Sequence, residues 1–246
     1  MELKICHLYP DLLNLYGDHG NVIALRRRCE ARKIPVSVTG ASFGERMDFM
    51  DYDLFFIGGG QNAEQAVLMD ELHAWRGAEI RALIEDGKPL LAICGGYQLL
   101  GTACKTWDGN QMDCIGALDL YSVGGKKRMI GDYMFRWDEM TEQGAEVKIV
   151  GFENHSAKTY LGPSLRPFGT VLAGFGNNGE DKTEGARYKN VFGTYSHGPL
   201  LPKNPAVADY LIELALQRKY GSADLVPLDD TLENNARDFL IRRLMR

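Results

Sequence analysis

Short apolar runs alternate with helix-like stretches along the first half of the chain. Four of these runs have the length and the branched or aromatic residues of buried strands. They occupy residues 3–9, 35–40, 52–57 and 89–93. The stretches between them repeat apolar residues at the spacing of one helix face. Helices are expected over residues 21–33, with Asp18 as N-cap, over 63–87, with a break near Gly77, and from 97 to about 104.

Strand–helix alternation of this kind predicts an α/β fold, with a mostly parallel sheet and helices on both of its faces. Residues 54–57 and 90–93 are apolar at successive positions. Strands have this composition when both faces of a parallel sheet are covered. We therefore expect these two segments in the middle of the sheet.

The second half of the chain has a different pattern, in which strand-like runs are separated by turn residues. We expect an antiparallel or mixed extension of the sheet in this half. A helix is predicted over residues 204–221, with Asn204 as N-cap and Pro205 in its first turn. The tail from about 228 to 246 predicts an amphipathic helix. We expect residues 1–246 to form a single domain.

Composition argues against several classes of function. The net charge is −5, and no basic stripe favours nucleic acid or an anionic membrane as partner. No apolar run approaches membrane-spanning length, and the N-terminus does not resemble a signal peptide. The five cysteines contain no CxxC pair, which favours a reducing cytoplasm over a disulfide framework. The five histidines form no metal-binding pattern, so no metal site is expected.

Cys94 lies between a predicted strand and two glycines, in the segment AICGGYQLLG at residues 92–101. A thiol at a sharp strand-to-helix turn is exposed to substrate, and unpaired N–H groups at a helix start favour its thiolate. The glycines let a substrate approach the backbone closely. This pattern predicts a cysteine nucleophile. The N–H of Gly95 is a candidate oxyanion donor, and Gly60, which ends the triplet after the strand at 54–57, is the second candidate.

A cysteine nucleophile needs a base, and His197 is the strongest of the five histidines. It follows an apolar strand and precedes Gly-Pro, which places it at a strand end, where open α/β sheets bind their ligands. His7 and His155 also lie at strand-like segments and stay as alternatives.

These residues resemble the class I (triad-type) glutamine amidotransferases, whose nucleophile motif is a strand followed by G-x-C-x-G-x-Q. Cys94, Gly96 and Gln98 match that motif, Ala92 replaces its first glycine, and His197 matches the late histidine. Four longer segments resemble the cobyric-acid-synthase-like branch, and within it the glutaminase subunits of lipid II-amidating synthases. They read NLYGDHGNVIALRRR, FFIGGGQNAEQ, VGFENH and GTYSHGPLLPKNP.

The resemblance implies a flavodoxin-like class I amidotransferase fold and the hydrolysis of L-glutamine to glutamate and ammonia. Cys94 would form a thioester, with His197 as acid and base. Arg128 is the residue to which the resemblance assigns the substrate α-carboxylate, because arginine grips a carboxylate bidentately. Gln98 is assigned to substrate binding with it.

The sequence departs from the wider class after the histidine. Many triad amidotransferases carry a glutamate two residues later, where this chain has Pro199. Glu153, another local acid or a carboxylate of a partner chain is then expected to orient His197. On this basis the isolated chain is expected to hydrolyse glutamine slowly until a partner completes the site.

The resemblance also implies a heterodimer with a Mur-ligase-like ATP-dependent subunit. This chain lacks a phosphate-binding GxxxxGK[ST] loop, so ATP and magnesium are expected in the partner, with no cofactor here. The partner would amidate the D-glutamate α-carboxylate of the lipid II stem peptide to D-isoglutamine. The expected location is the cytoplasm, at the inner face of the membrane.

Two other functions stay open from sequence alone. The chain could supply ammonia to a different synthase, such as a corrinoid amidase. It could also be a non-catalytic scaffold with this fold, a reading that Pro199 favours and the intact Cys94, Gln98 and His197 oppose.

Overall fold

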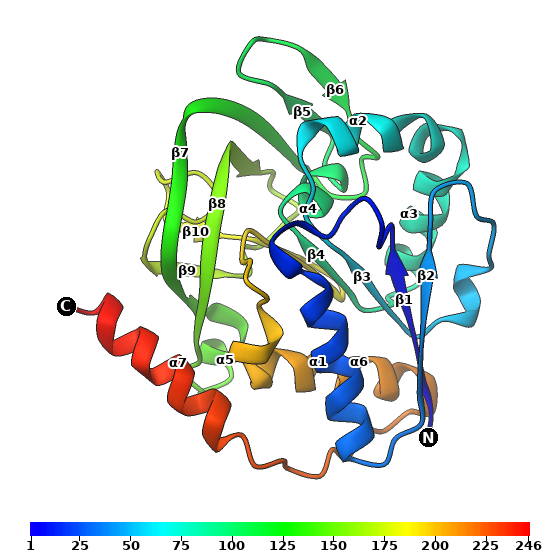
Figure 1. Ribbon diagram of the computed structural model, residues 1–246, viewed down its shortest axis with the longest axis vertical. Coiled ribbons are helices and arrows are strands. Elements are labelled where there is room, and N and C mark those ends of the chain that lie inside the picture. Colours follow the sequence, from blue (N-terminus) through cyan, green and yellow to red (C-terminus); the bar gives the residue numbers. More distant parts are fainter.

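The computed structural model describes residues 1–246, apart from the side chain of Asn62. Two six-stranded sheets stand side by side, with helices packed around the first of them (Figure 1). The α/β class and the mostly parallel first sheet are as expected from the sequence. Among the described residues, no helix has the length and apolar character needed to cross a membrane.

The first sheet has the strand order β11-β12-β4-β3-β1-β2. All of its neighbouring strands run parallel except the β11–β12 pair. The strands β3 and β4 are buried at every position, as their unbroken apolar sequence predicts, and β12 is buried throughout as well. The strands of this sheet are β1 (Leu3–Leu8), β2 (Val36–Ala41), β3 (Leu54–Ile57), β4 (Leu90–Ile93), β11 (Ala186–Tyr188) and β12 (Val191–Thr194).

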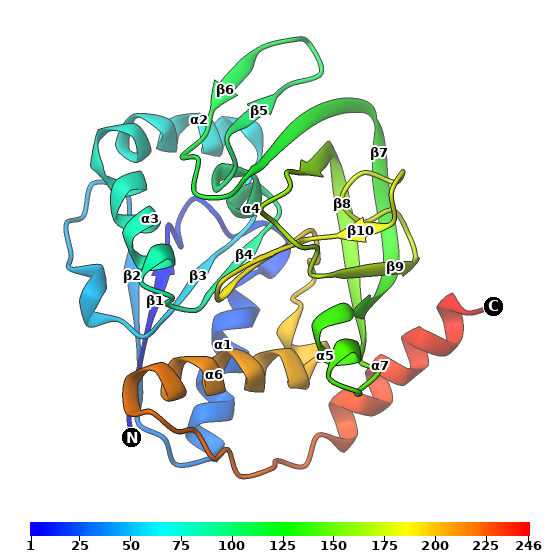
Figure 2. The ribbon, with the colours of Figure 1, turned by 180° about the vertical axis from the view of Figure 1, so that it is seen from behind.

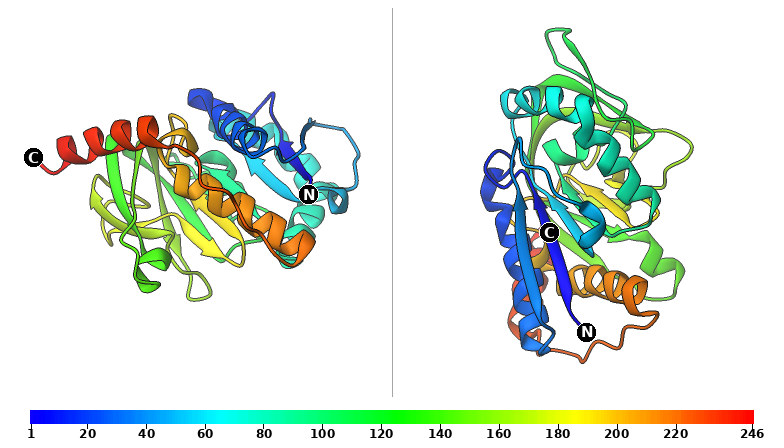
Figure 3. Two further views of the ribbon diagram at one scale, coloured as in Figure 1. Left: turned by 90° about the horizontal axis from the view of Figure 1, so that it is seen from below. Right: turned by 90° about the vertical axis from the view of Figure 1, so that its right-hand side faces the viewer.

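Helices cover both faces of this sheet (Figure 3). The chain moves from β1 to β2 in one direction along the sheet and from β3 to β4 in the other. Right-handed crossovers therefore place the connecting helices on opposite faces. The helix α1 packs against α6 on one face. The helices are α1 (His19–Ala31), α2 (Asn62–Glu71), a π-helical turn η3 (Leu72–Arg76), α3 (Gly77–Glu85) and α6 (Pro205–Tyr220).

The second sheet is built from strands within residues 103–184. Its centre is the long antiparallel pair β7–β8, and the β5–β6 hairpin projects from one end of the molecule (Figure 2). Only β11 and β12 extend the first sheet as expected, so most of the predicted mixed extension is a sheet of its own. The elements are β5 (Ala103–Lys105), β6 (Gln111–Asp113), β7 (Leu120–Trp137), α5 (Asp138–Glu142), β8 (Lys148–Leu161), β9 (Gly169–Ala173) and β10 (Thr183–Glu184).

The helix expected over residues 97–104 is shorter than predicted and begins earlier. The helix α4 (Gly95–Leu99) makes little more than one turn before the chain enters β5. The carbonyls of Leu99 and Leu100 accept hydrogen bonds from Ile115 and Leu118 instead of continuing the helix. Tertiary partners therefore override the local helical preference.

The C-terminal helix α7 (Thr231–Leu244) lies at the edge of the molecule, against β7 and β8 (Figure 1). Its apolar side is only partly covered, because Leu232 is 79% exposed and Phe239 is 60% exposed. Arg28 of α1 forms paired hydrogen bonds with Asp209 of α6 and with Asp230, the residue before α7. These contacts link the start of α7 to α6.

Candidate active site

Cys94 stands in a strained turn between β4 and α4. Its φ and ψ are 47° and −104°, a region that non-glycine residues seldom adopt and that costs roughly 1–3 kcal/mol. The strain is held by two backbone bonds, from the Cys94 N–H to the carbonyl of Thr194 (2.8 Å) and from the Gln98 N–H to the carbonyl of Cys94 (2.9 Å). The nucleophile elbow of hydrolases presents its side chain from a turn of the same kind.

Glycines allow the end of β3 to press against the start of α4. A methyl group on Gly95 would lie 2.8 Å from the amide nitrogen of Gly60, and one on Gly96 would lie 2.6 Å from the carbonyl of Gly58. The Gly96 N–H donates to that carbonyl (3.1 Å). Gly60 and Gly95, the two candidate oxyanion donors, are therefore neighbours beside Cys94, although their role stays a prediction.

The imidazole of His197 is oriented by Asp18, which the sequence predicted only as a helix N-cap. The Nδ1 atom of His197 lies 3.2 Å from both carboxylate oxygens of Asp18, and both side chains are fully buried. A carboxylate only accepts, so Nδ1 carries the hydrogen and Nε2 is left to exchange a proton with the thiol. Asp18 also accepts the Gly59 N–H (2.8 Å), which fixes the carboxylate in place. Although Asp18 occupies the N-cap position of α1, its side chain makes no cap hydrogen bond.

The charges around His197 favour its protonated form. Burial by itself lowers the pKa of His197, but the charge of Cys94 and the hydrogen bond with Asp18 raise the pKa to about 10. The structure thus favours an imidazolium at His197, beside the side chain of Cys94. A protonated imidazole in this place can act as the acid for a leaving group.

Gly59 lies between the side chains of Cys94, His197 and Asp18. A methyl group at this position would lie 2.6 Å from Cε1 of His197, 3.1 Å from Oδ2 of Asp18 and 3.4 Å from Cβ of Cys94. The glycine triplet after β3 therefore does more than make a turn, because its middle residue leaves room for the imidazole.

The N-terminus of α1 packs directly on the segment that follows His197. The side chain of Asn21 accepts the Leu201 N–H (2.9 Å) and donates to the carbonyl of Asp18 (3.1 Å). Gly20 faces Pro199, and a methyl group on Gly20 would lie 2.5 Å from Cγ of the proline ring. Pro199 thus packs against the helix whose N-cap residue is Asp18. The expected slow hydrolysis by the isolated chain stays a prediction.

A cavity of about 290 Å³ opens at Cys94. This volume is near the lower end of the range for small-molecule sites, about 300–1,000 Å³. The guanidinium of Arg128 lines it and donates through Nε to the side-chain oxygen of Asn154. The other lining residues are Leu15, Gly60, Gln61, Ala63, Gln98, His155, Ser156 and Ala157.

Gln98 lines this cavity but its side chain is already engaged. Its amide nitrogen donates to the Tyr195 hydroxyl (2.9 Å), and its oxygen accepts from the amide of Gln65 (3.0 Å). These contacts hold the wall of the cavity next to Cys94. They favour a structural part in shaping the site, and the assignment of Gln98 to substrate binding stays a prediction.

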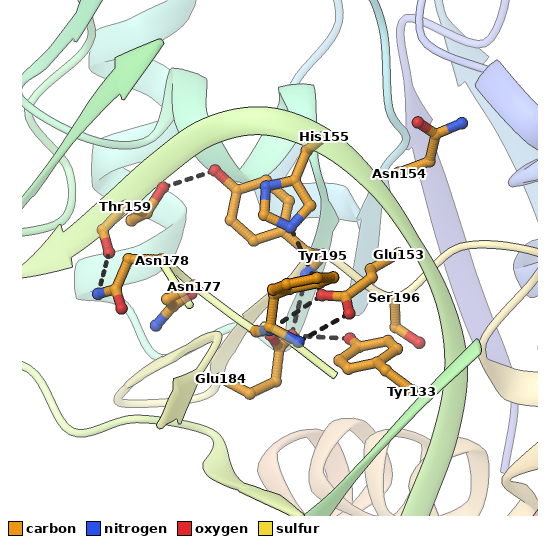
Figure 4. A network of polar contacts seen from close by, with 12 residues as sticks. Tyr133, Glu153, Asn154, His155, Thr159, Asn177, Asn178, Glu184, Tyr195 and Ser196 are labelled. Carbon is orange, nitrogen blue, oxygen red and sulfur yellow. Dashed lines mark hydrogen bonds and ion pairs between the residues drawn. The ribbon is translucent and has the colours of Figure 1, made fainter. Parts of the chain in front are cut away.

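Glu153, one of the three expected sources of the orienting carboxylate, makes other contacts, and another local acid, Asp18, lies at His197. The carboxylate of Glu153 accepts the N–H groups of Phe175 (2.8 Å) and Gly176 (2.9 Å) and lies 3.7 Å from Nε2 of His155. The carboxylate that contacts His197 is that of Asp18. Figure 4 shows the side chains of Glu153 and His155 within a buried network of polar contacts that also contains Tyr195 and Glu184. The side chain of Asn154 points away from it, as strand alternation requires.

The two alternative bases have other environments. His155 stacks on Tyr195 with ring centroids 3.6 Å apart, and its Nδ1 atom contacts the carbonyl of Ala157 (2.8 Å). His7 is buried beside His19 and Phe56, and burial lowers its pKa to about 4. Only His197 of the three combines a buried acid on one nitrogen with the charge of Cys94.

Sequence reasoning missed Asp18 because a helix N-cap explained it locally. One signal could have found it. Asp18 lies in the loop after β1, which is paired with β3, and ligands in open α/β sheets bind at the carboxyl ends of such strands. Any acid in that loop was therefore a candidate partner for a base at the end of β12.

The comparisons with known proteins agree with this geometry. Residues 4–205 match the CobB/CobQ-like glutamine amidotransferase domain. The chain is 44% identical over 245 residues to the lipid II isoglutaminyl synthase (glutamine-hydrolysing) subunit GatD of Staphylococcus aureus, covering 100% of this chain and 97% of that protein. It is 38% identical over 227 residues to the subunit of the same name from Streptococcus pneumoniae, covering 92% and 85%.

More distant similarity extends to cobyric acid synthases and to solved amidotransferase structures. The cobyric acid synthase of Listeria monocytogenes is 31% identical over 160 residues, which cover 61% of this chain and 29% of that protein. The fold is similar to a glutamine amidotransferase of Thermotoga maritima (TM-score 0.54, 15% identity, covering 100% of this chain and 97% of that one). The profile match and the relatives together show that the chain belongs to the CobB/CobQ-like glutamine amidotransferase family.

Proposed function

We propose that this chain is the glutamine-hydrolysing subunit of a lipid II isoglutaminyl synthase. The observation that carries the proposal is the line Cys94–His197–Asp18 beside a cavity that Arg128 also lines. Identities of 44% and 38% to two subunits that bear this name support the choice of synthase. The buried acid argues against the non-catalytic scaffold, because a scaffold has no use for an oriented imidazole.

The proposed reaction converts L-glutamine and water to L-glutamate and ammonia. The Cys94 thiolate attacks the side-chain amide carbon, and the N–H groups of Gly60 and Gly95 stabilise the oxyanion. His197 gives its proton to the departing ammonia, which leaves a thioester on Cys94. His197 then takes a proton from water, whose attack on the thioester releases glutamate and restores the Cys94 thiolate. Asp18 keeps the imidazole in the required tautomer through both steps.

Arg128 is proposed to bind the α-carboxylate of glutamine. Asn154 takes its Nε atom, which leaves the terminal nitrogens for the substrate. We expect Arg128→Ala to lower kcat/KM by about ten- to a hundredfold and Arg128→Lys to recover part of the loss, since a charged hydrogen bond contributes roughly 1.5–3 kcal/mol. Unchanged kinetics for the alanine variant would mean that Arg128 is a solvent-exposed residue of β7 with no part in binding glutamine.

The ammonia is proposed to be used by a Mur-ligase-like, ATP-dependent partner that forms a heterodimer with this chain. ATP and magnesium belong to that partner, and this chain needs no cofactor of its own. The partner would amidate the D-glutamate α-carboxylate of lipid II to D-isoglutamine. The use of ATP and of a lipid-linked substrate favours the cytoplasm, at the inner face of the membrane.

Two measurements test the proposal. First, glutamine-dependent ammonia release is compared between the wild type and Cys94→Ala, with Cys114→Ala as a matched control. We expect the Cys94 variant alone to lose activity, and a glutamine-analogue electrophile to label Cys94. Burial raises the pKa of Cys6 and of Cys29 to about 12, so their thiols should stay unlabelled. Full activity of Cys94→Ala would contradict the mechanism.

Second, the chain is purified with its co-expressed ligase partner and given ATP, glutamine and lipid II. Formation of D-isoglutamine in the stem peptide, lost in Cys94→Ala, is the expected result. A complex that instead amidates a corrinoid carboxylate would keep the glutaminase and overturn the choice of synthase. The partial match to cobyric acid synthases is the reason for including that second substrate.

A further inference from the structure

Tyr16 lies against the catalytic histidine from an unusual backbone position. It is the middle residue of the 3-10 turn η1 (Leu15–Gly17), with φ 56° and ψ 24°. This left-handed conformation is uncommon for a tyrosine and points to a constraint from the surroundings. The turn is fastened on both sides, by the Leu15 N–H to the carbonyl of Gly59 (2.9 Å) and by the His19 N–H to the side chain of Asn14 (2.8 Å).

The two ends of the Tyr16 side chain contact two different parts of the site. Its ring meets the imidazole of His197 edge to face, with centroids 5.0 Å apart and planes at 75°. Its hydroxyl oxygen accepts a hydrogen bond from the side-chain amide of Asn154 (2.6 Å). The oxygen of that amide accepts in turn from Arg128. A chain of contacts therefore runs from His197 through Tyr16 and Asn154 to Arg128, and its last two residues line the cavity.

Burial supports the contact with the imidazole. His197 is 0% exposed, whereas Tyr16, whose ring contacts the imidazole, is 42% exposed. An imidazolium paired with Asp18 keeps a strong charge interaction only where water is excluded. An edge-to-face neighbour also limits the tilt of the imidazole ring.

We propose that Tyr16 is a positioning residue with two separable functions. Its ring holds and shields His197, and its hydroxyl, through Asn154, holds Arg128 in place for the α-carboxylate of glutamine. The proposal rests on the proposed glutaminase function and goes beyond it by assigning a task to each end of one side chain. The ring affects the chemical step, and the hydroxyl affects the binding of glutamine.

The experiment compares steady-state ammonia release by the full chain with its co-purified partner in five variants. Tyr16→Phe keeps the ring, and we expect KM for glutamine to rise about five- to tenfold with kcat nearly unchanged, as the loss of one hydrogen bond allows. Asn154→Ala should raise KM similarly. The double variant should be no worse than either single variant, because both remove the same link.

Tyr16→Ala removes the ring, and we expect kcat to fall at least tenfold. Its pH profile for alkylation of Cys94 should also shift, because water then reaches His197. Tyr16→Gly is the matched control for the backbone, since glycine adopts the left-handed conformation without strain. If only the backbone mattered, the glycine variant would recover activity that the alanine variant lacks. Such recovery would overturn the role of the ring.

The outcomes separate this proposal from the proposed function. Wild-type KM in both Tyr16→Phe and Asn154→Ala would refute the role of the hydroxyl. Wild-type kcat and pH profile in Tyr16→Ala would refute the role of the ring. Absence of glutaminase activity in the wild-type complex would instead refute the proposed function. Thermal unfolding of each variant shows whether a loss comes from misfolding, and Tyr16→Phe, which keeps the ring packed, still tests the proposal in that case.

Discussion

The carboxylate of Asp18 lies 3.2 Å from Nδ1 of His197, although 179 positions separate the two residues in the chain. The acid comes from the loop after β1 and the base from the end of β12. The two residues meet because β1 and β12 belong to one parallel sheet, in which β3 and β4 lie between them. The carboxyl ends of parallel strands lie at the same edge of the sheet. A complete acid–base pair is therefore available within this chain, without a residue from a partner.

Asp18→Asn tests this pair directly. Asparagine keeps the size of the side chain and an acceptor for the Gly59 N–H, but it no longer stabilises the imidazolium. We expect kcat for glutamine hydrolysis to fall by about 10²- to 10⁴-fold, by analogy with the loss of the acid in other triads. Asp11→Asn, in the same loop, makes the same change of charge and should keep activity. Equal kinetics for the two variants would assign the orienting acid elsewhere.

Gly59→Ala tests the space between the three side chains. The added methyl group would lie 2.6 Å from the imidazole, so His197 has to move away from Cys94 or Asp18. We expect kcat to fall about a hundredfold, since small displacements of catalytic groups carry losses of that size. Thermal unfolding of the variant should show that the fold persists. An active alanine variant would show that the site tolerates a displaced imidazole.

Titration of His197 by NMR tests whether Cys94 and His197 form a thiolate–imidazolium ion pair. The nearby charge of Cys94 contributes to the raised pKa of about 10, so the imidazole should stay protonated through neutral pH in the wild type. In Cys94→Ala that contribution is lost. Burial, which disfavours the charged imidazolium, is then less well balanced, so the pKa of His197 should fall. A wild-type pKa near the ordinary value of 6.5, unchanged in the variant, would contradict the thiolate–imidazolium pair.

Glu184 predicts a pH dependence of stability. Its carboxylate is fully buried and accepts from Tyr133, Thr194 and the Tyr195 N–H, yet burial raises its pKa to about 7. An acid whose pKa is raised in the folded state contributes stability at low pH and loses it as pH rises. Between the ordinary pKa of 4.5 and pH 7 this amounts to about 3 kcal/mol.

Glu184→Gln should remove that part of the pH dependence, because an amide does not ionise and its oxygen keeps the three hydrogen bonds. The measurement is the free energy of unfolding in urea from pH 5 to pH 8. Glu142→Gln, at an exposed glutamate, is the control and should follow the wild type. A parallel decline in wild type and Glu184→Gln would mean that another group titrates.

The nucleophile could be predicted from sequence because its signal is local. A buried strand, a thiol and two glycines follow one another at residues 90–96, and the structure places Cys94 in the expected turn. The central parallel strands were predictable for the same reason, since residues 54–57 and 90–93 are apolar throughout. Each of these patterns is contained within about ten residues.

The acid could not be predicted in this way. Asp18 has a sufficient local explanation as a helix N-cap, and its contact with His197 depends on the order of strands in the sheet. Glu153 was one of the expected sources of the orienting carboxylate, but its oxygens accept the N–H groups of Phe175 and Gly176 instead. The contact of Tyr16 with His197 was hidden for the same reason as the acid.

The packing of Pro199 on Gly20 restricts the order in which substitutions can accumulate during evolution. The glutamate that many triad amidotransferases carry two residues after the histidine would add a second carboxylate to a site where Asp18 already orients His197, and like charges at one buried site disfavour each other. Any larger residue at position 20 would push on the proline, because even a methyl group comes within 2.5 Å of its ring. A lineage that moved the acid from one position to the other would pass through sequences with two acids or with none. The two arrangements are therefore separated by an epistatic barrier, and positions 18, 20 and 199 should change together or stay unchanged.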